Sequence, residues 1–420
     1  MSISRRGLGG LIAGGMLVPG ALLAGSASSE RKFLFVFCVG GWDPTWVFAN
    51  LLGSKDVDTD PTAQPGVVGG LSFVDSAARP AVRSFFESYA DRCCILNGIE
   101  VRSITHEACR RIILTGGTAG LADDWPAIIA GTSSGFTLPD LVLSGPAYTA
   151  QYTGSVMRVG PDGQLGKLLS GEALSSSDLT AETLSESANA SIEAFLRERS
   201  AAAQVGTSGQ PARFLSDYDT ALGQLDAIRA LSGQLDLSVD GSGYVTVQER
   251  AVPALDCFEL GLTRCGVIEH AGEWDIGWDS HSGIDQQGAH FEVLFDDLAG
   301  ILADLSQRTG SQGGSLLDEV TVVVLSEMGR APQLNVTGGK DHWTYTSAML
   351  IGAGVSGGRI IGGYDDQLLG RPVDLRSGSV TDSGTGLTAA NLGATLLAMA
   401  DIDPAEFTEA EPIAAAMSGD

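Results

Sequence analysis

Five continuous apolar runs along the chain predict buried strands. They occupy residues 32–39, 93–99, 265–269, 320–325 and 349–352. Each run is short and bounded by turn-forming or polar residues, which is typical of strands that are buried on both faces and mainly parallel. Shorter strand-like pieces are expected within 140–159, and the stretch 49–74, rich in Gly, Pro and Asp, is expected to be a long loop.

Amphipathic segments separate these runs and predict helices at 79–90, 105–116, 251–262, 290–307 and 389–400. Strands that alternate with helices predict an α/β fold with a central, mainly parallel sheet. A chain of 420 residues is long enough to bury a large core.

The pattern changes at about residues 175–235, where alanine-rich amphipathic segments replace the alternation of strand and helix. Two surface helices are expected there, at 181–204 and 212–235. We interpret this part as a helical insertion or lid over the sheet. Residues 28–420 are therefore expected to form a single domain that carries this insertion.

Residues 1–27 have the pattern of an export signal. Arg5 and Arg6 form a twin-arginine sequence, residues 9–23 are rich in Gly, Ala and Leu, and residues 24–27 resemble a cleavage site. The alternative is a membrane anchor, but the segment is too short and too rich in glycine for a spanning helix. The pattern predicts export by the twin-arginine translocase to the periplasm or medium, with no integral membrane segment left after cleavage.

Charge and cysteine spacing narrow the possible functions. The chain carries 51 acidic and 25 basic residues, a net charge of −26, which argues against nucleic-acid binding because that needs clustered Lys and Arg. The six cysteines show no CxxC spacing, so a zinc–thiolate site is not expected. Cys38, Cys93 and Cys94 lie within apolar runs, where buried free thiols are expected.

Carboxylates and histidines follow or precede several of the predicted strands. Asp43 and Glu327 come after strands, and the pair Asp341-His342 precedes one. Ligands in open α/β sheets bind outside the carboxyl ends of the strands, so these side chains are candidate metal ligands. For Glu327, a salt bridge to Arg330 is the alternative, because a buried carboxylate needs some partner.

Asp279 and His281 form another candidate pair. In an extended loop, alternate residues point the same way, so this carboxylate and imidazole can converge on one cation. His290 opens an amphipathic helix and is interpreted as a capping or surface residue. The sequence leaves the role of His270 open.

Thr105, followed by His106, is the candidate catalytic position. A hydroxyl at a helix N-terminus benefits from the helix dipole and from backbone N–H groups that hold anions. The alternative is an ordinary N-cap.

These motifs in this order resemble a family of exported bacterial proteins, domain of unknown function 1501 (DUF1501), within the alkaline phosphatase/sulfatase superfamily. The resemblance spans about residues 32–407 and is carried by GGWD, the TH-plus-helix segment, GWDSH, LSEMGR, GGKDHW, GGRIIGG and LGATLLAMADIDPAEF. It implies a three-layer alkaline-phosphatase-like α/β fold.

The resemblance also implies two metal positions. Asp43, the nucleophile Thr105 and Glu327 would match the first, with Met328 standing where the family pattern places a histidine. Asp279, His281 and His342, joined by Asp341, would match the second. The sulfatase motif, a Cys or Ser followed by Pro and Arg, is absent from SITHEACR, which argues against a standard sulfatase.

The implied function is a metal-dependent hydrolase of phosphate, or related sulfate or phosphonate, esters. Thr105 would act by in-line displacement on a small anionic ester, with one or two divalent ions of Zn, Mn, Mg or Ca. The alternative is a catalytically degenerate binding or scaffold protein of the periplasm or cell surface that retains the fold.

Overall fold

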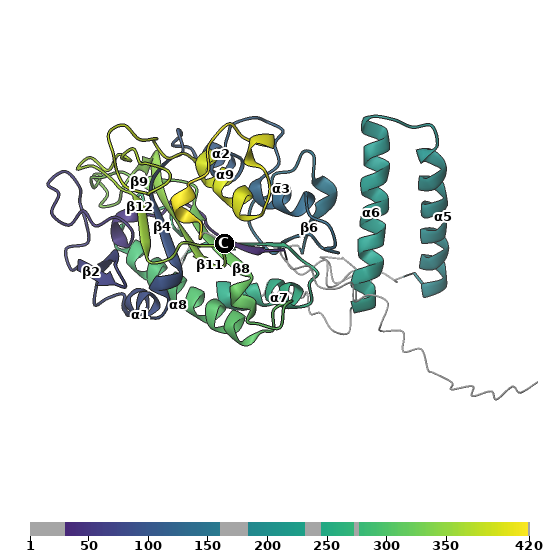
Figure 1. Cartoon of the computed structure of the whole chain (residues 1–420), viewed down its shortest axis with the longest axis horizontal. Coiled ribbons are helices and arrows are strands. Elements are labelled where there is room, and N and C mark those ends of the chain that lie inside the picture. Colours follow the sequence, from purple (N-terminus) through teal and green to yellow (C-terminus); the bar gives the residue numbers. More distant parts are fainter. Residues whose placement is uncertain (1–29, 160–183, 232–244, 273–276, 419–420) are drawn as a thin grey trace, which may run out of the picture.

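The computed structural model describes residues 30–159, 184–231, 245–272 and 277–418. The predicted signal peptide therefore lies outside the described residues. Helices cover both faces of one large sheet, which confirms the predicted α/β class (Figure 1). None of the described helices combines the length and the apolar character needed to span a bilayer.

The large sheet has the strand order β12-β4-β11-β8-β1-β7-β5-β6. Its strands are β1 (Lys32–Cys38), β4 (Cys93–Glu100), β5 (Asp140–Val142), β6 (Val156–Arg158), β7 (Cys265–His270), β8 (Val320–Ser326), β11 (Tyr345–Gly352) and β12 (Arg359–Gly362). Every pairing is parallel except those of β11, which runs antiparallel to both β4 and β8.

The direction of β11 corrects the expectation that each apolar run forms a parallel strand. A continuous apolar run shows burial on both faces, and burial is the same in either direction. The consequence for the site is direct. The start of β11 lies at the same edge of the sheet as the ends of β1, β4, β7 and β8.

The two faces of the sheet bury separate cores. Alternate residues of β1 point to opposite sides, with Leu34 and Val36 in one cluster and Phe33 and Phe35 in the other. The first face packs against α1 (Pro80–Tyr89), α7 (Val247–Glu259) and α8 (Gln286–Gln307). The second packs against α2 (His106–Thr115), α3 (Trp125–Gly131) and α9 (Ala389–Met399), so the fold has three layers (Figure 1).

The predicted loop 49–74 instead contains most of a two-stranded hairpin. A small hairpin pairs β2 (Gln64–Val68) with β3 (Leu71–Asp75) around the turn Gly69-Gly70, where both residues have positive φ. Gly, Pro and Asp density marks turns correctly, but it hid the alternating residues on either side of this turn. A second small sheet joins β9 (Gly329–Arg330) to β10 (His342–Trp343).

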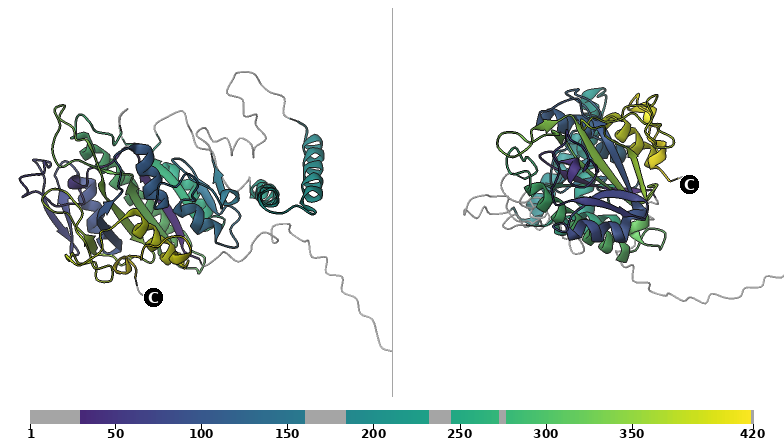
Figure 2. Two further views of the ribbon diagram at one scale, coloured as in Figure 1. Left: turned by 90° about the horizontal axis from the view of Figure 1, so that it is seen from above. Right: turned by 90° about the vertical axis from the view of Figure 1, so that its left-hand side faces the viewer.

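The predicted insertion contains the two expected helices, α5 (Glu186–Gln204) and α6 (Gln210–Leu231). They form an antiparallel pair that stands beside the β6 end of the sheet (Figures 1 and 2). Arg213 donates to the carbonyl of Gln151 at 2.8 Å, and Gln224 donates to that of Gly154 at 3.4 Å. The insertion therefore contacts the far end of the sheet, beyond β5, and these contacts do not form a lid over the strand ends described below.

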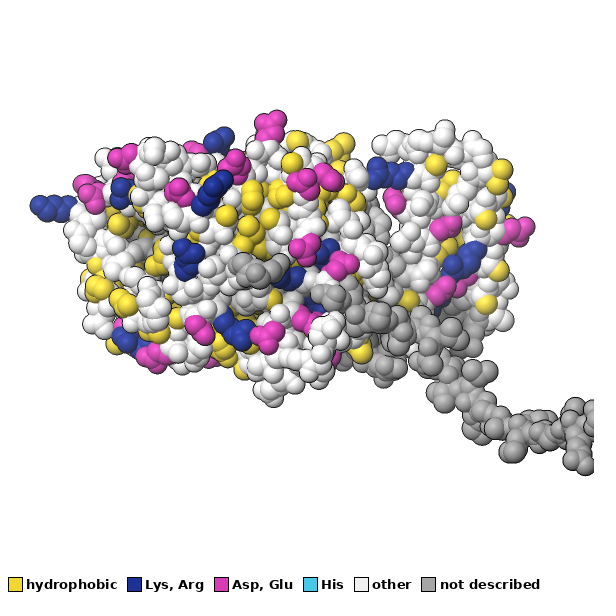
Figure 3. Space-filling model, in the orientation of Figure 1, with side chains coloured by type: hydrophobic (Ala, Val, Ile, Leu, Met, Phe, Trp, Pro, Cys, Tyr) yellow, Lys and Arg dark blue, Asp and Glu magenta, His cyan; other side chains and the backbone are white. Residues whose placement is uncertain are grey.

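Acidic and basic side chains are mixed on the visible surface. On the face in Figure 3, the described Lys and Arg side chains stand singly or in small groups among acidic ones.

All six cysteines lie among the described residues and are buried and free, as expected for those in apolar runs. Burial raises the pKa of the Cys93 thiol well above its usual value.

Candidate metal centre

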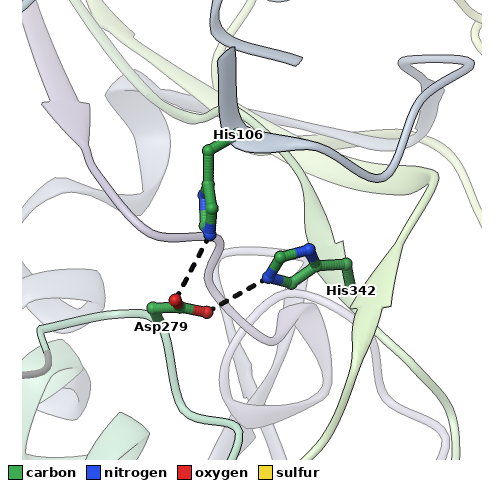
Figure 4. Close-up of side chains that lie close together, drawn as sticks. All are labelled: His106, Asp279 and His342. Carbon is green, nitrogen blue, oxygen red and sulfur yellow. Dashed lines mark hydrogen bonds and ion pairs between the residues drawn. The ribbon is translucent and has the colours of Figure 1, made fainter. Parts of the chain in front are cut away.

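One cluster of imidazoles and carboxylates lies at the sheet edge where β1, β4, β7 and β8 end and β11 begins. The ligand atoms of His106, Asp279 and His342 all lie within 4.8 Å of one another (Figure 4). His106 opens α2 after β4, Asp279 follows β7, and His342 precedes β11. These three positions are far apart in the sequence and meet because the topology brings the strand ends together.

The distances fit the edges of a metal coordination shell. Asp279 Oδ1 lies 3.2 Å from His342 Nε2 and 3.3 Å from His281 Nε2. The two Nε2 atoms of His281 and His342 are 2.9 Å apart. Tetrahedral zinc with ligand bonds of about 2.0–2.1 Å places its ligand atoms roughly 3.3 Å from one another. His106 Nε2 lies 3.3 Å from the other carboxylate oxygen, Asp279 Oδ2.

The outer nitrogen of each imidazole faces an oxygen. His342 Nδ1 lies 2.6 Å from the carbonyl of Ile104, which only accepts hydrogen bonds, so this nitrogen carries the proton. His106 Nδ1 lies 3.0 Å from Glu327 Oε1, and His281 Nδ1 lies 3.2 Å from Asp341 Oδ1. Metal-binding histidines usually donate their other N–H in this way, which leaves Nε2 free to bind the ion.

Two carboxylates that the sequence suggested as metal ligands, Glu327 and Asp341, therefore lie on the Nδ1 side of the imidazoles. Glu327 is fully buried, and its Oε1 also accepts the backbone N–H of Gly40 at 2.9 Å. Asp341 is exposed and accepts from Asn335 at 3.1 Å. In this structure both carboxylates orient histidines. His106, which the sequence suggested for catalysis, lies among the candidate ligands.

Charged neighbours set the ionisation of the cluster. Hydrogen bonds to Asp279 and Glu327 raise the pKa of His106 to about 9, against the opposing effect of burial. Burial opposes ionisation of Asp279, but hydrogen bonds from His106 and Arg330 outweigh it and hold the pKa of this carboxyl well below its usual range. Without an ion, the cluster is therefore a network of charge-assisted hydrogen bonds.

Arg330 is a functional neighbour whose partner differs from the one considered from the sequence. Its guanidinium is fully buried and lies 2.7 Å from Asp279 Oδ1, instead of pairing with Glu327. It also donates to the carbonyls of Gly41 at 2.8 Å and Lys340 at 3.2 Å, and to that of Gly40. Arg330 thereby binds the same oxygen of Asp279 that His281 and His342 approach. Its place in LSEMGR gave no signal of this contact.

The side chain of Asp43 bonds to Lys340 and Thr45, which are not part of the cluster. Its Oδ2 accepts from Lys340 Nζ at 2.7 Å, and its Oδ1 accepts from the backbone N–H and the hydroxyl of Thr45 at 3.0 and 2.7 Å. Both oxygens of this buried carboxylate are therefore occupied by donors of the chain itself. The sequence reasoning missed Lys340 because nothing in GGKDHW indicates that its ammonium reaches the end of β1.

Thr105 is the N-cap of α2, with extended backbone and no side-chain capping hydrogen bond. Its hydroxyl is 3.5 Å from that of Ser103, and the next residue is His106 of the cluster. Met328 is fully buried in the core and makes no part of the imidazole cluster. A Cβ on Gly41 would come within 2.7 Å of its Cγ, so Met328 packs directly beneath the glycine turn after β1.

The residues present fit a divalent cation. Among the described residues, the imidazoles of His106 and His342 converge with the carboxylate of Asp279, and His281 lies beside His342 and Asp279. Each of the three imidazoles is oriented by an outer oxygen. A nitrogen-rich set of this kind suits zinc better than calcium or magnesium, which prefer oxygen ligands.

Comparisons with known structures return distant likenesses. A glycosaminoglycan-metabolism protein from Bacteroides thetaiotaomicron matches with a TM-score of 0.36 and 10% identity, covering 92% of this chain and 76% of the other. A protein in complex with its substrate D-glucosamine-2-N,6-O-disulfate matches with a TM-score of 0.32 and 11% identity, covering 91% and 81%. The phosphonate monoester hydrolase of Agrobacterium radiobacter matches with a TM-score of 0.32 and 11% identity, covering 88% and 74%.

No curated protein matches the chain in sequence. The family model described as "Protein of unknown function (DUF1501)" matches residues 240–411, which include Asp279, His281, Glu327, Asp341 and His342. This match covers less than half of the chain and agrees with the resemblance to DUF1501 that the motifs predicted.

Proposed function

We propose that the protein is a metal-dependent hydrolase of phosphate esters or of related sulfate or phosphonate esters. The observation that carries the proposal is that the Nε2 atoms of three imidazoles lie 3.2–3.3 Å from the carboxylate oxygens of Asp279, each imidazole being oriented through Nδ1. His106, His281, His342 and Asp279 would hold one ion, for which zinc is the best fit. A divalent cation held there supplies positive charge that stabilises the charge developing on the ester oxygens.

The chain's own residues supply the rest of the proposed chemistry. Thr105 presents a hydroxyl at the uncapped N-terminus of α2, directly before a histidine of the cluster. Backbone N–H groups at a helix N-terminus hold anions, so the ester's oxygens can bind beside the attacking hydroxyl. Arg110, one turn further along α2, lies 3.6 Å from Glu327 and adds positive charge to this side. Thr105 is therefore the proposed nucleophile.

Export by the twin-arginine route to the periplasm or medium belongs to the same proposal, on the pattern of residues 1–27. Residues 28–420 are proposed to act as one domain with a helical insertion. The contacts of α6 with the carbonyls of Gln151 and Gly154 support an insertion beside the β6 end of the sheet.

Zinc titration of the metal-free protein, followed by assays on aryl phosphates, phosphonates and sulfates, tests the proposal. We expect one tightly bound zinc ion and hydrolysis of at least one ester class. Thr105→Ala should abolish hydrolysis and leave zinc binding unchanged, with Ser103→Ala as the matched control two residues away. No bound zinc, manganese, magnesium or calcium and no hydrolysis would exclude the enzyme.

A binding or scaffold protein is the second candidate. The observations that favour it are the occupied carboxylate of Asp43 and the burial of Met328 where the family pattern places a histidine. A chain that binds zinc but hydrolyses no ester of the panel would support this candidate.

A further inference from the structure

We infer that Asp43 is not a metal ligand in this chain but one half of a buried ion pair with Lys340, whose ammonium takes the place of a second cation. The pair also braces the loop that carries Asp341 and His342. The inference about the ion pair stands on its own contacts. The further conclusion, that the chain binds at most one metal ion, rests on the proposed function.

The surroundings of the pair leave no position for a further ion. Asp43 and Lys340 are 0% and 1% exposed, and their charged atoms lie 2.7 Å apart. Lys340 Nζ also donates to the carbonyl of Asp58 at 2.6 Å. Because Thr45 occupies the other oxygen of Asp43, an added cation would have to displace donors and lie beside an ammonium group.

The backbone of Lys340 connects the two loops that carry the imidazoles. Its N–H donates to the carbonyl of Ser280 at 3.0 Å, between Asp279 and His281. Its carbonyl accepts from Arg330 at 3.2 Å, and Arg330 also bonds Asp279. The backbone of Lys340 therefore fixes the position of His342 relative to Asp279.

A second connection runs from Asp43 to the same loop. The N–H of Asp43 donates to the side-chain oxygen of Gln287 at 2.9 Å. The side-chain nitrogen of Gln287 donates to the carbonyl of Trp278 and the hydroxyl of Ser280, both at 2.9 Å. Asp43 thus holds the 278–280 segment through Gln287 and the 340–342 segment through Lys340. Both segments carry imidazole or carboxylate groups of the candidate centre.

The test uses the full exported chain as wild type, Asp43→Asn, Lys340→Met and the double variant. Zinc content after dialysis and zinc affinity by calorimetry are measured, together with urea unfolding of the metal-free proteins. We expect at most one ion in every variant and a weakening of zinc affinity by about tenfold in each single variant, the range typical of residues that orient ligands. The double variant should lose no more than either single one, because both lose the same pair.

Lys340→Arg should retain much of the zinc affinity that Lys340→Met loses, since arginine keeps the positive charge. Lys55→Met, at an exposed lysine, and Asp56→Asn, at an exposed aspartate, are the matched controls and should change neither quantity. If Lys340→Met does not fold, the ion counts of the wild type and Asp43→Asn decide the question.

Two ions in the wild type, with one lost in Asp43→Asn, would overturn the inference and leave the hydrolase intact. Additive losses of stability in the double variant would also overturn it. No ion in any protein, with strong coupling between the two substitutions in unfolding, would exclude the hydrolase while the ion pair stands.

Discussion

Asp43 and Asp279 lie at the same edge of the sheet, and both follow apolar strands, yet their surroundings are opposite. Asp43 is fully buried and its oxygens are bound by an ammonium, a hydroxyl and an amide N–H. The side chain of Asp279 is 38% exposed and faces three imidazoles and one guanidinium. A carboxylate with both oxygens occupied by fixed donors of the chain is structural, whereas one that also faces imidazole Nε2 atoms can share an ion with them.

Asp279→Asn is the substitution with the largest expected effect. It removes the charge at the centre of the cluster and leaves the buried guanidinium of Arg330 without its carboxylate. We expect zinc affinity to fall by more than about 100-fold, beyond the 10–100-fold cost typical of outer partners. Calorimetric zinc titration measures this, with the exposed Asp285→Asn as a matched control. Retained affinity would remove Asp279 from the ligand set.

Glu327→Gln tests whether the buried glutamate orients His106 or binds the ion itself. An amide oxygen can still accept from His106 Nδ1, so we expect a loss of zinc affinity of about tenfold. The pKa of His106 in the metal-free protein, raised to about 9 in part by Glu327, should fall when that charge is removed. NMR titration of the ring protons measures the change. Complete loss of zinc would instead make Glu327 a direct ligand.

The smallest effect is the pH dependence of stability in the metal-free protein. The pKa of His106 is raised in the folded state to about 9, so its contribution is fully present below the unfolded value of about 6.5 and is lost as pH rises through about 9. Since the group is partly exposed, we expect a fall on the order of 1 kcal/mol over this window. Urea unfolding at several pH values measures it, and His106→Gln should remove the fall. A wild-type curve as flat as that of the variant would contradict the prediction.

The sequence predicted most of the fold because burial and periodicity are local signals. The runs that became β1, β4, β7 and β8 were recognisable from apolar residues alone, and α8 from its broad apolar face. The β2–β3 hairpin was missed because its strands are short and rich in turn residues. The direction of β11 was not readable, since a strand buried on both faces has the same composition in either direction.

The sequence by itself determined which residue types stand at the strand ends, including Asp279, His281 and His342 of the candidate centre. Only the tertiary structure decided their roles. It placed His106 among the imidazoles, moved Glu327 to the outer side of His106, and paired Asp43 with Lys340. The physical reason is that a buried charge is defined by the partner that neutralises it, and these partners come from strands and loops distant in sequence.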